Sequence, residues 1–299
     1  MGWNPVKSLI RQIHQNRQVR KAKDFRNALV KGYFRSRNAA SGAEFAEELR
    51  RTGARHFCFS IAYNTPWVID ALTKAWLTYS SGMTLVVIDN SSKPAARQAI
   101  EAICRRRGIA YFGLPRNPEW NPNRSHGIAM NWVFHNIVRP LRPDLFGFLD
   151  HDCFPVVALD IATRMAGTDA YGTKYPAKRG HEGWYFWAGL CFFRFSVVED
   201  LELDFTPRFD TGLDTGGGNW PMLRDRLDDS NIVNAEKTTI SLKLGGIEAD
   251  HRMMDNSFFH VGGASYRGLI STRHYRRLMC DHVWETYLGG VAERLVNDL

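Results

Sequence analysis

The sequence predicts an α/β fold in which helices flank a mostly parallel central sheet. Strand-like and helix-like segments alternate regularly between residues 56 and 155, as in folds of this class. The strand-like segments are short, continuous apolar runs, which is typical of parallel strands buried on both faces. The chain has 299 residues, of which 44% are hydrophobic, so it can bury a large core without disulfide bonds.

Each element in this region has a local signal. Apolar runs predict four strands, at residues 56–62, 83–89, 109–114 and 145–150. The intervening segments predict helices at residues 65–79, 92–107 and 125–138. Thr65-Pro66, Ser92 with Pro94, and Ser125 are expected to begin these helices, and Gly108 and Pro140 to end the second and third. Three strands finish in polar residues, Tyr63-Asn64, Asp89-Asn90 and Asp150-His151-Asp152, at the edge where such sheets bind ligands.

The second half of the chain has a different composition. After residue 155 the alternation stops, and glycine and aromatic residues become frequent, which suits a half that shapes a substrate pocket. Residues 275–299 predict an amphipathic helix. We therefore divide the chain into a basic helical segment (1–45), a catalytic domain (46–273) with a nucleotide-binding half (46–155) and an acceptor half (156–273), and a C-terminal helix (274–299).

The positive charge is concentrated at the start of the chain. Residues 1–40 hold ten Lys and Arg against one acid, Asp24, which leaves 29 basic and 30 acidic residues for the remainder. The segment is compatible with an amphipathic helix whose apolar stripes are Val6, Leu9, Ile10 and Ile13, and Phe25, Ala28 and Leu29. Such a helix either lies on an anionic membrane surface or packs against the body. Nucleic-acid binding is disfavoured because no binding motif accompanies the basic residues.

Cysteine usage and hydropathy indicate the compartment. The five cysteines are scattered, without CxxC or Cys/His pairing, so we interpret them as reduced thiols. No apolar run reaches the roughly 18 to 20 residues of a membrane span, and no signal-peptide core is present. We expect a cytoplasmic protein; if the basic segment lies on a membrane and does not pack on the body, attachment would be peripheral, at the inner face.

The segment FGFLDHDCFP places two carboxylates, Asp150 and Asp152, where an apolar strand gives way to a loop. Carboxylates one residue apart can converge on one Mn²⁺ or Mg²⁺ and its phosphate ligands. The pattern is common in loops, but its place after three strand-helix units favours a metal and nucleotide site over a structural turn. No GxGxxG follows the first strand and no GxxxxGK[ST] occurs, which disfavours dinucleotide oxidoreductases and P-loop enzymes.

Three segments agree in order and spacing with one family. LVVIDNSS resembles its second-strand motif VVDNxS, SHGIAMNW its G-x-x-x-N helix, and FGFLDHDCFP its DxD strand. The chain thus resembles glycosyltransferases of the GT-A fold, particularly the family 2-like enzymes of bacterial polysaccharide assembly. The resemblance covers residues 56–155, and 180–265 more loosely, and implies a Rossmann-like fold. The family's Glu-Asp base motif and a transmembrane anchor are not visible, so processive polymer extrusion is not expected.

The resemblance implies a donor-binding role for several residues. Asp89 would hydrogen-bond the nucleotide base, and Ala62 and Tyr63 would pack beside it. Arg124 and Asn131 would face the donor side of the cleft, where the arginine could pair with a phosphate. The alternative for Asp89 is a turn-initiating residue, and for Asn131 a residue that packs its helix.

The resemblance also implies a metal site. Asp150 would contact the ribose or the metal, and Asp152 would be the principal metal ligand. Enzymes of this fold often recruit a late histidine to the metal, and His260 in SFFHVGG resembles that position. A core histidine is the alternative role, and His251 the alternative ligand. Mn²⁺ or Mg²⁺ is the expected cofactor, and a nucleoside diphosphate sugar, first of all a UDP-sugar, the expected donor.

An inverting transfer needs a base that takes the proton of the acceptor hydroxyl. Asp214 in GLDTGGGNWP is the preferred candidate, because a glycine-rich backbone can approach a ligand closely. Asp210 and Glu182 are rivals, and a cap or turn role is the alternative for each. Among the aromatic residues, Trp220 is the expected acceptor platform. Residues 184–187 could stack on sugar rings, but dense aromatic residues at strand spacing favour a place in the core.

These observations predict a metal-dependent hexosyltransferase that uses a nucleoside diphosphate sugar and a glycan or lipid-linked acceptor in bacterial surface polysaccharide-type assembly. One alternative is a nucleotidyltransferase with the same paired acids, which would normally carry a glycine-rich basic loop where this chain has IAYNTPW. Another is a non-catalytic adaptor that binds membrane or nucleic acid through the basic N-terminus. The near-neutral body with acids at its strand ends favours an enzyme.

Overall fold

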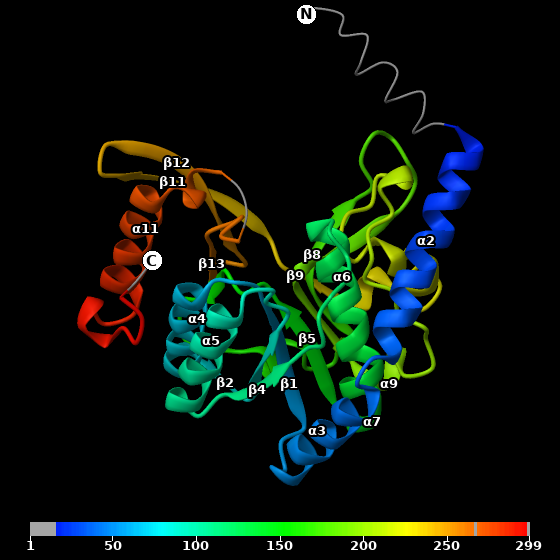
Figure 1. The fold of residues 1–299 in the computed structure, drawn as a ribbon, viewed down its shortest axis with the longest axis horizontal. Coiled ribbons are helices and arrows are strands. Elements are labelled where there is room, and N and C mark those ends of the chain that lie inside the picture. Colours follow the sequence, from blue (N-terminus) through cyan, green and yellow to red (C-terminus); the bar gives the residue numbers. More distant parts are fainter. Residues whose placement is uncertain (1–15, 266–267, 298–299) are drawn as a thin grey trace, which may run out of the picture.

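The computed structural model describes residues 16–265 and 268–297 (Figure 1). In these residues a seven-stranded central sheet has the order β10-β8-β9-β5-β1-β3-β4. Its strands are β1 (His56–Ala62), β3 (Thr84–Asp89), β4 (Ala110–Gly113), β5 (Leu145–Leu149), β8 (Ala170–Pro176), β9 (Trp184–Arg194) and β10 (Ile232–Asn234). Neighbouring strands pair in parallel except at β9, which runs antiparallel to β5 and β8. The predicted α/β class with a mostly parallel sheet is confirmed.

Helices cover both faces of this sheet (Figure 1). The longer ones are α2 (Arg17–Ser36), α3 (Ala39–Arg51), α4 (Pro66–Tyr79), α5 (Pro94–Arg107), α6 (Pro122–Val133) and α11 (Arg273–Tyr287). Short helices are α7 (Arg139–Leu141), α8 (Ile161–Arg164), α9 (Phe195–Val198) and α10 (Trp220–Leu223). Helices α4, α5 and α11 share one apolar core with the sheet, and α2, α3 and α6 share the other. Because alternate residues of β1, such as Phe57 and Cys58, enter opposite cores, the strand reads as one apolar run.

A second, antiparallel sheet of the described residues brings a late segment to the end of β5. It has the order β11-β12-β13-β6. Its strands are β6 (Cys153–Pro155), β11 (Lys237–Leu244), β12 (Ile247–Met254) and β13 (Phe258–His260), and a separate small pair joins β2 (Ser80–Ser81) to β7 (Leu159–Asp160). The register of β13 on β6 sets His260 opposite Cys153. His260 therefore lies beside the Asp-His-Asp segment, although more than 100 residues separate them.

The structure corrects three predicted helix boundaries. Asn121, not Ser125, caps α6, because its side chain accepts the backbone N–H of Arg124 at 3.0 Å. The helical path then continues through a π-helical turn, Phe134–Val138, into α7, so Pro140 lies inside its last turn. The predicted C-terminal helix at 275–299 is too long. It ends at Tyr287, and the following Gly289 and Gly290 have φ of 84° and 104°.

Helix α2 packs on the body and also presents apolar side chains to solvent. Phe34 is buried, and Lys31 Nζ lies 2.6 Å from Asp204 Oδ2. Phe25 and Leu29 of the second predicted stripe are exposed. The first predicted stripe, Val6, Leu9, Ile10 and Ile13, lies outside the described residues.

The structure also bears on the cysteines and on membrane spans. All five cysteines are buried and free, as expected for reduced thiols. No helix in the described part of the chain combines the length and the apolar character that a bilayer crossing requires.

The Lys31–Asp204 pair predicts a pH-dependent contribution to stability. Burial opposes ionisation of Asp204, but Lys31, Asn131 and Thr206 together lower the pKa of its carboxyl. Since the folded pKa lies below the unfolded value of about 3.9, the stabilisation is present at neutral pH and is lost as the pH falls below about 4. Asp204→Asn should lower the free energy of unfolding by about 1–2 kcal/mol at pH 7 and by progressively less towards pH 3.

Urea denaturation at several pH values measures this difference. Asp210→Asn serves as the control, because Asp210 is exposed on a short 3₁₀ turn. A stability difference for Asp204→Asn that stays constant between pH 7 and pH 3 would contradict the assignment.

Candidate active site

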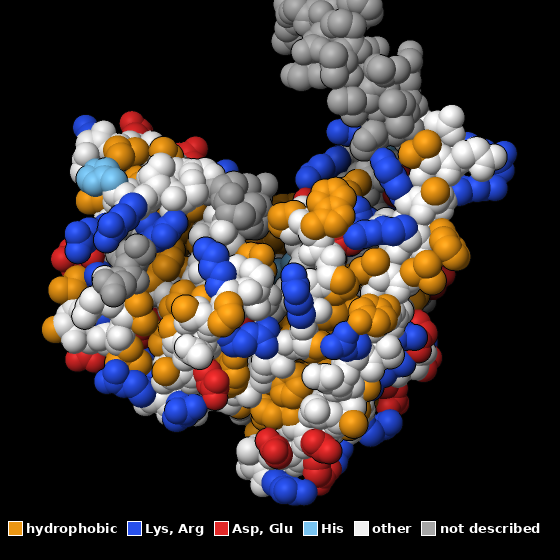
Figure 2. Space-filling view, in the orientation of Figure 1, with side chains coloured by type: hydrophobic (Ala, Val, Ile, Leu, Met, Phe, Trp, Pro, Cys, Tyr) orange, Lys and Arg blue, Asp and Glu red, His pale blue; other side chains and the backbone are white. Residues whose placement is uncertain are grey.

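The principal cavity lies at the topological switch point of the central sheet. The chain moves from β1 to β3 and β4 on one side and then returns to β5 on the other side of β1. At such a point the adjacent loops separate and leave a crevice beyond the carboxyl ends of the strands. The cavity has a volume of about 570 Å³, and Tyr63, Asn90, Asp150 and Asp152 from the three polar strand ends line it. Figure 2 shows the surface hollowed between the parts that carry β12 and α6.

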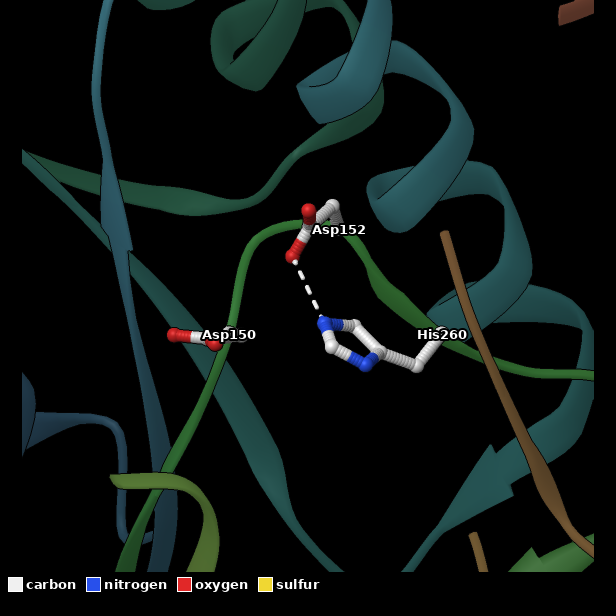
Figure 3. A group of neighbouring side chains, drawn as sticks. All are labelled: Asp150, Asp152 and His260. Atoms are coloured by element: carbon white, nitrogen blue, oxygen red, sulfur yellow. Dashed lines mark ion pairs between the residues drawn. The ribbon is translucent and has the colours of Figure 1, made fainter. Parts of the chain in front are cut away.

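Asp150, Asp152 and His260 form a candidate metal centre on the cavity wall (Figure 3). Each offers one ligand atom, and these atoms lie within 4.8 Å of one another, in the one such group found among the described residues. His260 Nε2 lies 3.4 Å from Asp152 Oδ1, while Asp152 Oδ2 accepts the backbone N–H of Ala264 at 3.1 Å. Two carboxylates and an imidazole are a suitable donor set for Mn²⁺ and, less well, Mg²⁺.

The electrostatics of the three groups also fit a divalent cation. Burial and the neighbouring Asp152 raise the pKa of Asp150 to about 6. Burial opposes ionisation of Asp152 too, but His260 and the Ala264 amide hold its pKa well below the ordinary value. Burial lowers the pKa of His260, yet the two carboxylates outweigh this effect and raise it. Two buried carboxylates this close need positive charge between them, which a proton or a metal ion can provide.

Three further residues line the cavity: His126, which had no predicted role, His151 between the two aspartates, and Trp187, which was expected in the core. His126 on α6 lies with Nε2 3.6 Å from Asp150 Oδ1, and burial lowers its pKa to about 4, so the imidazole is neutral at pH 7. His151 contacts Ser265 Oγ through Nε2 at 2.8 Å. The ring of Trp187 lies 4.7 Å from that of His260, centroid to centroid. Only their place in the sequence could have pointed to them. His126 directly precedes the glycine of the motif SHGIAMNW, and Trp187 lies in the aromatic run that forms part of β9.

The predicted base-binding residues divide between the cavity wall and the interior. Tyr63 lines the cavity, and Ala62 is buried behind it. Asp89 is fully buried, where its carboxylate accepts the Ser91 backbone N–H at 2.8 Å and the Tyr111 hydroxyl at 3.0 Å. Asn90 takes its place on the wall. The bond to the Ser91 amide, two residues on, is the one that a turn-initiating aspartate makes, which was the alternative role for Asp89.

Arg124 and Asn131 lie on α6 without contributing to the cavity wall. Asn131 donates to Asp204 Oδ1 at 2.8 Å and accepts the Phe205 backbone N–H at 2.7 Å. Asn131 thereby holds α6 against residues 204–205. This is the alternative role named above, that of a residue that packs its helix. Arg124 Nε lies 3.7 Å from Glu119 Oε2, in an ion pair at the start of α6.

Of the base candidates, Asp214 reaches the cavity. Its Oδ1 accepts from Asn123 Nδ2 and from the Thr215 backbone N–H, both at 2.9 Å. Lys178 Nζ lies 3.5 Å from its Oδ2. The rivals Asp210 and Glu182 are exposed and do not line the cavity.

The aromatic prediction is corrected. Trp220 packs edge-on against Trp184 at 5.4 Å and does not line the cavity. Trp187 and Trp120 do, and Trp120 is 79% exposed. Tyr185 and Phe186 belong to the core as expected. Strand alternation explains the split, because Trp187 follows a buried Phe186 on β9 and faces the other way.

The comparisons with known proteins give structural likenesses only. The sequence matches no protein-family model and no curated protein sequence. The structure is similar to the mannosyltransferase PcManGT from Pyrobaculum calidifontis, solved with GDP-Man and Mn²⁺, at 12% identity and a TM-score of 0.42 over 60% of this chain and 54% of that one. This chain thus spans about half the length of that enzyme.

Two further solved structures are similar to this chain at low sequence identity. The galactosyltransferase LgtC, solved with donor and acceptor sugar analogues, is 14% identical with a TM-score of 0.40, over 60% of this chain and 73% of that one. TarS from S. aureus, solved with UDP-GlcNAc, is 15% identical with a TM-score of 0.35, over 50% of this chain and 48% of that one.

Proposed function

We propose that this chain is a divalent-metal-dependent glycosyltransferase of the GT-A fold that uses a nucleoside diphosphate sugar. The observation that carries the proposal is the grouping of Asp150, Asp152 and His260 within 4.8 Å on a cavity at the switch point of a mostly parallel sheet. Hard oxygen ligands favour a metal that binds phosphate, and the crevice is where such sheets hold nucleotides. Asp214 on the same cavity supplies a carboxylate for the acceptor.

The donor would lie along the strand ends. Tyr63 and Asn90 would contact the nucleoside, because both line the cavity where β1 and β3 end. Asp150, Asp152 and His260 would hold Mn²⁺ or Mg²⁺, which when bound neutralises charge on the diphosphate. Trp187, packed against His260, would fix the imidazole and exclude water from it.

Asp214 would act as the base of an inverting transfer. The acceptor oxygen attacks the anomeric carbon, the bond from that carbon to the diphosphate oxygen breaks, and the diphosphate keeps the electron pair. The acceptor proton would pass to Asp214 Oδ2, the oxygen that lies 3.5 Å from Lys178 Nζ. Asn123 and the Thr215 amide hold the other oxygen, so the carboxylate is oriented before the acceptor arrives.

The proposal also includes the donor, the acceptor, the place in the cell and the domain bounds. A UDP-hexose is the first donor to test, and the acceptor is a glycan or lipid-linked sugar of bacterial surface polysaccharide-type assembly. The enzyme would work in the cytoplasm, peripherally at the inner membrane face. Residues 46–273 would form the catalytic domain, between the basic segment at 1–45 and the C-terminal segment at 274–299.

Nucleotide-sugar binding with and without metal tests this function. UDP-, GDP-, CMP- and dTDP-sugars are each added to the purified chain with Mn²⁺ or with EDTA, and thermal unfolding is followed. One donor at about 100 times its dissociation constant should raise the Tm by roughly 5 °C, since ligand binding stabilises by about 2.7 kcal/mol at that ratio. The increase should vanish in EDTA.

The product separates this function from nucleotidyl transfer. Transfer from a UDP-, GDP- or dTDP-sugar releases the nucleoside diphosphate and transfer from a CMP-sugar releases CMP, whereas nucleotidyl transfer from a nucleoside triphosphate to a sugar phosphate releases pyrophosphate. No metal-dependent shift with any donor, or release of pyrophosphate alone, would overturn the proposal.

A further inference from the structure

Helix α2 carries an apolar stripe that faces solvent. Phe25, Leu29 and Tyr33 are four residues apart, so they lie on one face of the helix. Their exposed fractions are 67%, 58% and 53%. Three large apolar side chains in one row are unusual on a free surface, where such residues are normally scattered singly.

The stripe is not the packing face of the helix. Phe34 and Val30 on the other side pack into the core beneath α6, and Lys31 pairs with Asp204 at 2.6 Å. Arg26 also forms an ion pair with Glu119. These contacts fix the rotation of α2 on the body, so Phe25, Leu29 and Tyr33 stay outward.

Basic residues surround the stripe. Residues 17–36 contain seven Lys and Arg and one acid, Asp24. Three of the seven, Arg26, Lys31 and Arg35, pair with acids of the body. Arg17, Arg20 and Lys21 near the start of α2 are exposed. Figure 2 shows basic and hydrophobic side chains together on the part of the surface that carries α2. A partner of this face must therefore accept apolar side chains and carry negative charge.

We propose that this face of α2 binds the surface of an anionic lipid bilayer. Phe25, Leu29 and Tyr33 would enter the boundary between headgroups and acyl chains, and the cations would contact acidic headgroups. Nucleic acid satisfies the charge but leaves three large apolar side chains in water. A bilayer satisfies both, and Tyr33 is of the type enriched at this boundary.

The helix that carries the docking face contacts the cavity wall through one ion pair. Glu119, the partner of Arg26, lines the cavity together with Trp120. A bilayer on α2 would thus lie beside the cavity wall, where a lipid-linked acceptor could reach it. This consequence rests on the proposed glycosyltransferase function, whereas bilayer binding by α2 does not.

Vesicle sedimentation with the full chain tests the docking face. Vesicles of phosphatidylcholine alone are compared with vesicles containing about 30% phosphatidylglycerol, and binding should require the anionic lipid and weaken with salt. The double substitution Phe25→Ser and Leu29→Ser should reduce affinity for the anionic vesicles at least about tenfold. Arg20→Ser with Lys21→Ser should also weaken it severalfold.

Matched control variants distinguish binding by this face of α2 from non-specific adsorption of the protein to vesicles. Leu77 and Val157 are exposed by 55% and 44% away from α2, so Leu77→Ser with Val157→Ser should leave vesicle binding unchanged. Arg105→Ser with Arg106→Ser on α5 controls for charge. Unchanged binding by the Phe25/Leu29 variant, an equal loss in the Leu77/Val157 variant, or binding of nucleic acid without binding of anionic vesicles would overturn the proposal. Donor binding, measured separately, reports only on the glycosyltransferase assignment.

Discussion

Replacing Asp152 with asparagine is expected to reduce sugar transfer at least about a thousandfold, roughly 4 kcal/mol of transition-state stabilisation. Asparagine keeps the shape of the side chain and an oxygen that can accept from Ala264, but it removes the negative charge. His260 and the Ala264 amide hold the pKa of Asp152 well below its ordinary value, so the native side chain is fully ionised at pH 7. The substitution therefore removes a full charge from the metal centre, and kcat/KM with Mn²⁺ measures the loss.

The matched control is another aspartate that accepts a backbone N–H. Asp228 accepts from Ser230 at 2.8 Å, is exposed, and does not line the cavity, so Asp228→Asn should retain activity and the metal-dependent rise in Tm. Asp152→Asn should lose both while keeping the circular dichroism spectrum of the folded chain. A folded Asp152→Asn protein with undiminished transfer would remove the basis of the proposed function.

The metal centre shows what local sequence can predict and how. Asp150 and Asp152 follow directly from an apolar strand, so their place at the sheet edge could be derived from period and polarity alone. His260 required the family resemblance, because the pairing of β13 with β6 is long-range and nothing in SFFHVGG specifies it. The structure brings all three together, and their roles as ligands stay a prediction.

Two residues of the resembling segments, Asp89 and Asn131, do not line the cavity. The folded chain uses both as internal hydrogen-bond acceptors. A motif gives the position of a residue along the chain but not the direction of its side chain. That direction depends on partners such as Tyr111 and Phe205, which come from other elements.

The second half of the chain could be predicted only in outline. Strands β11, β12 and β13 form an antiparallel sheet that closes on β6, and its register depends on long-range pairing. The pattern of β11 alternates between half-exposed and exposed residues, which gives little hydrophobic signal. The place of Trp187 on the cavity wall could not be predicted for a similar reason. Whether an aromatic side chain of β9 faces the core or the cavity depends on the elements that pack against the strand.

Asp214 differs from its near-repeat, Asp210, more in its place in the fold than in its local sequence. The segments FDTG and LDTG place an aspartate before Thr-Gly at 210 and at 214. Asp210 lies exposed on a 3₁₀ turn, whereas Asp214 is half-buried on the cavity wall with one oxygen held by Asn123. Asp210 is therefore a matched control for Asp214: the local sequences are similar, but only Asp214 lies on the cavity wall.

Asp214→Asn is expected to lower kcat by about 10²–10⁴-fold, the usual contribution of a general base, because the amide cannot take the acceptor proton. The KM for the donor should change less than about threefold, since the metal centre is untouched. Asp210→Asn should leave both constants unchanged. Steady-state kinetics with the donor identified by thermal shift measure these values, and NMR of the product reports inversion at the anomeric carbon. An equal loss in both variants, or a loss confined to donor KM, would show that Asp214 binds or supports the loop and is not the base.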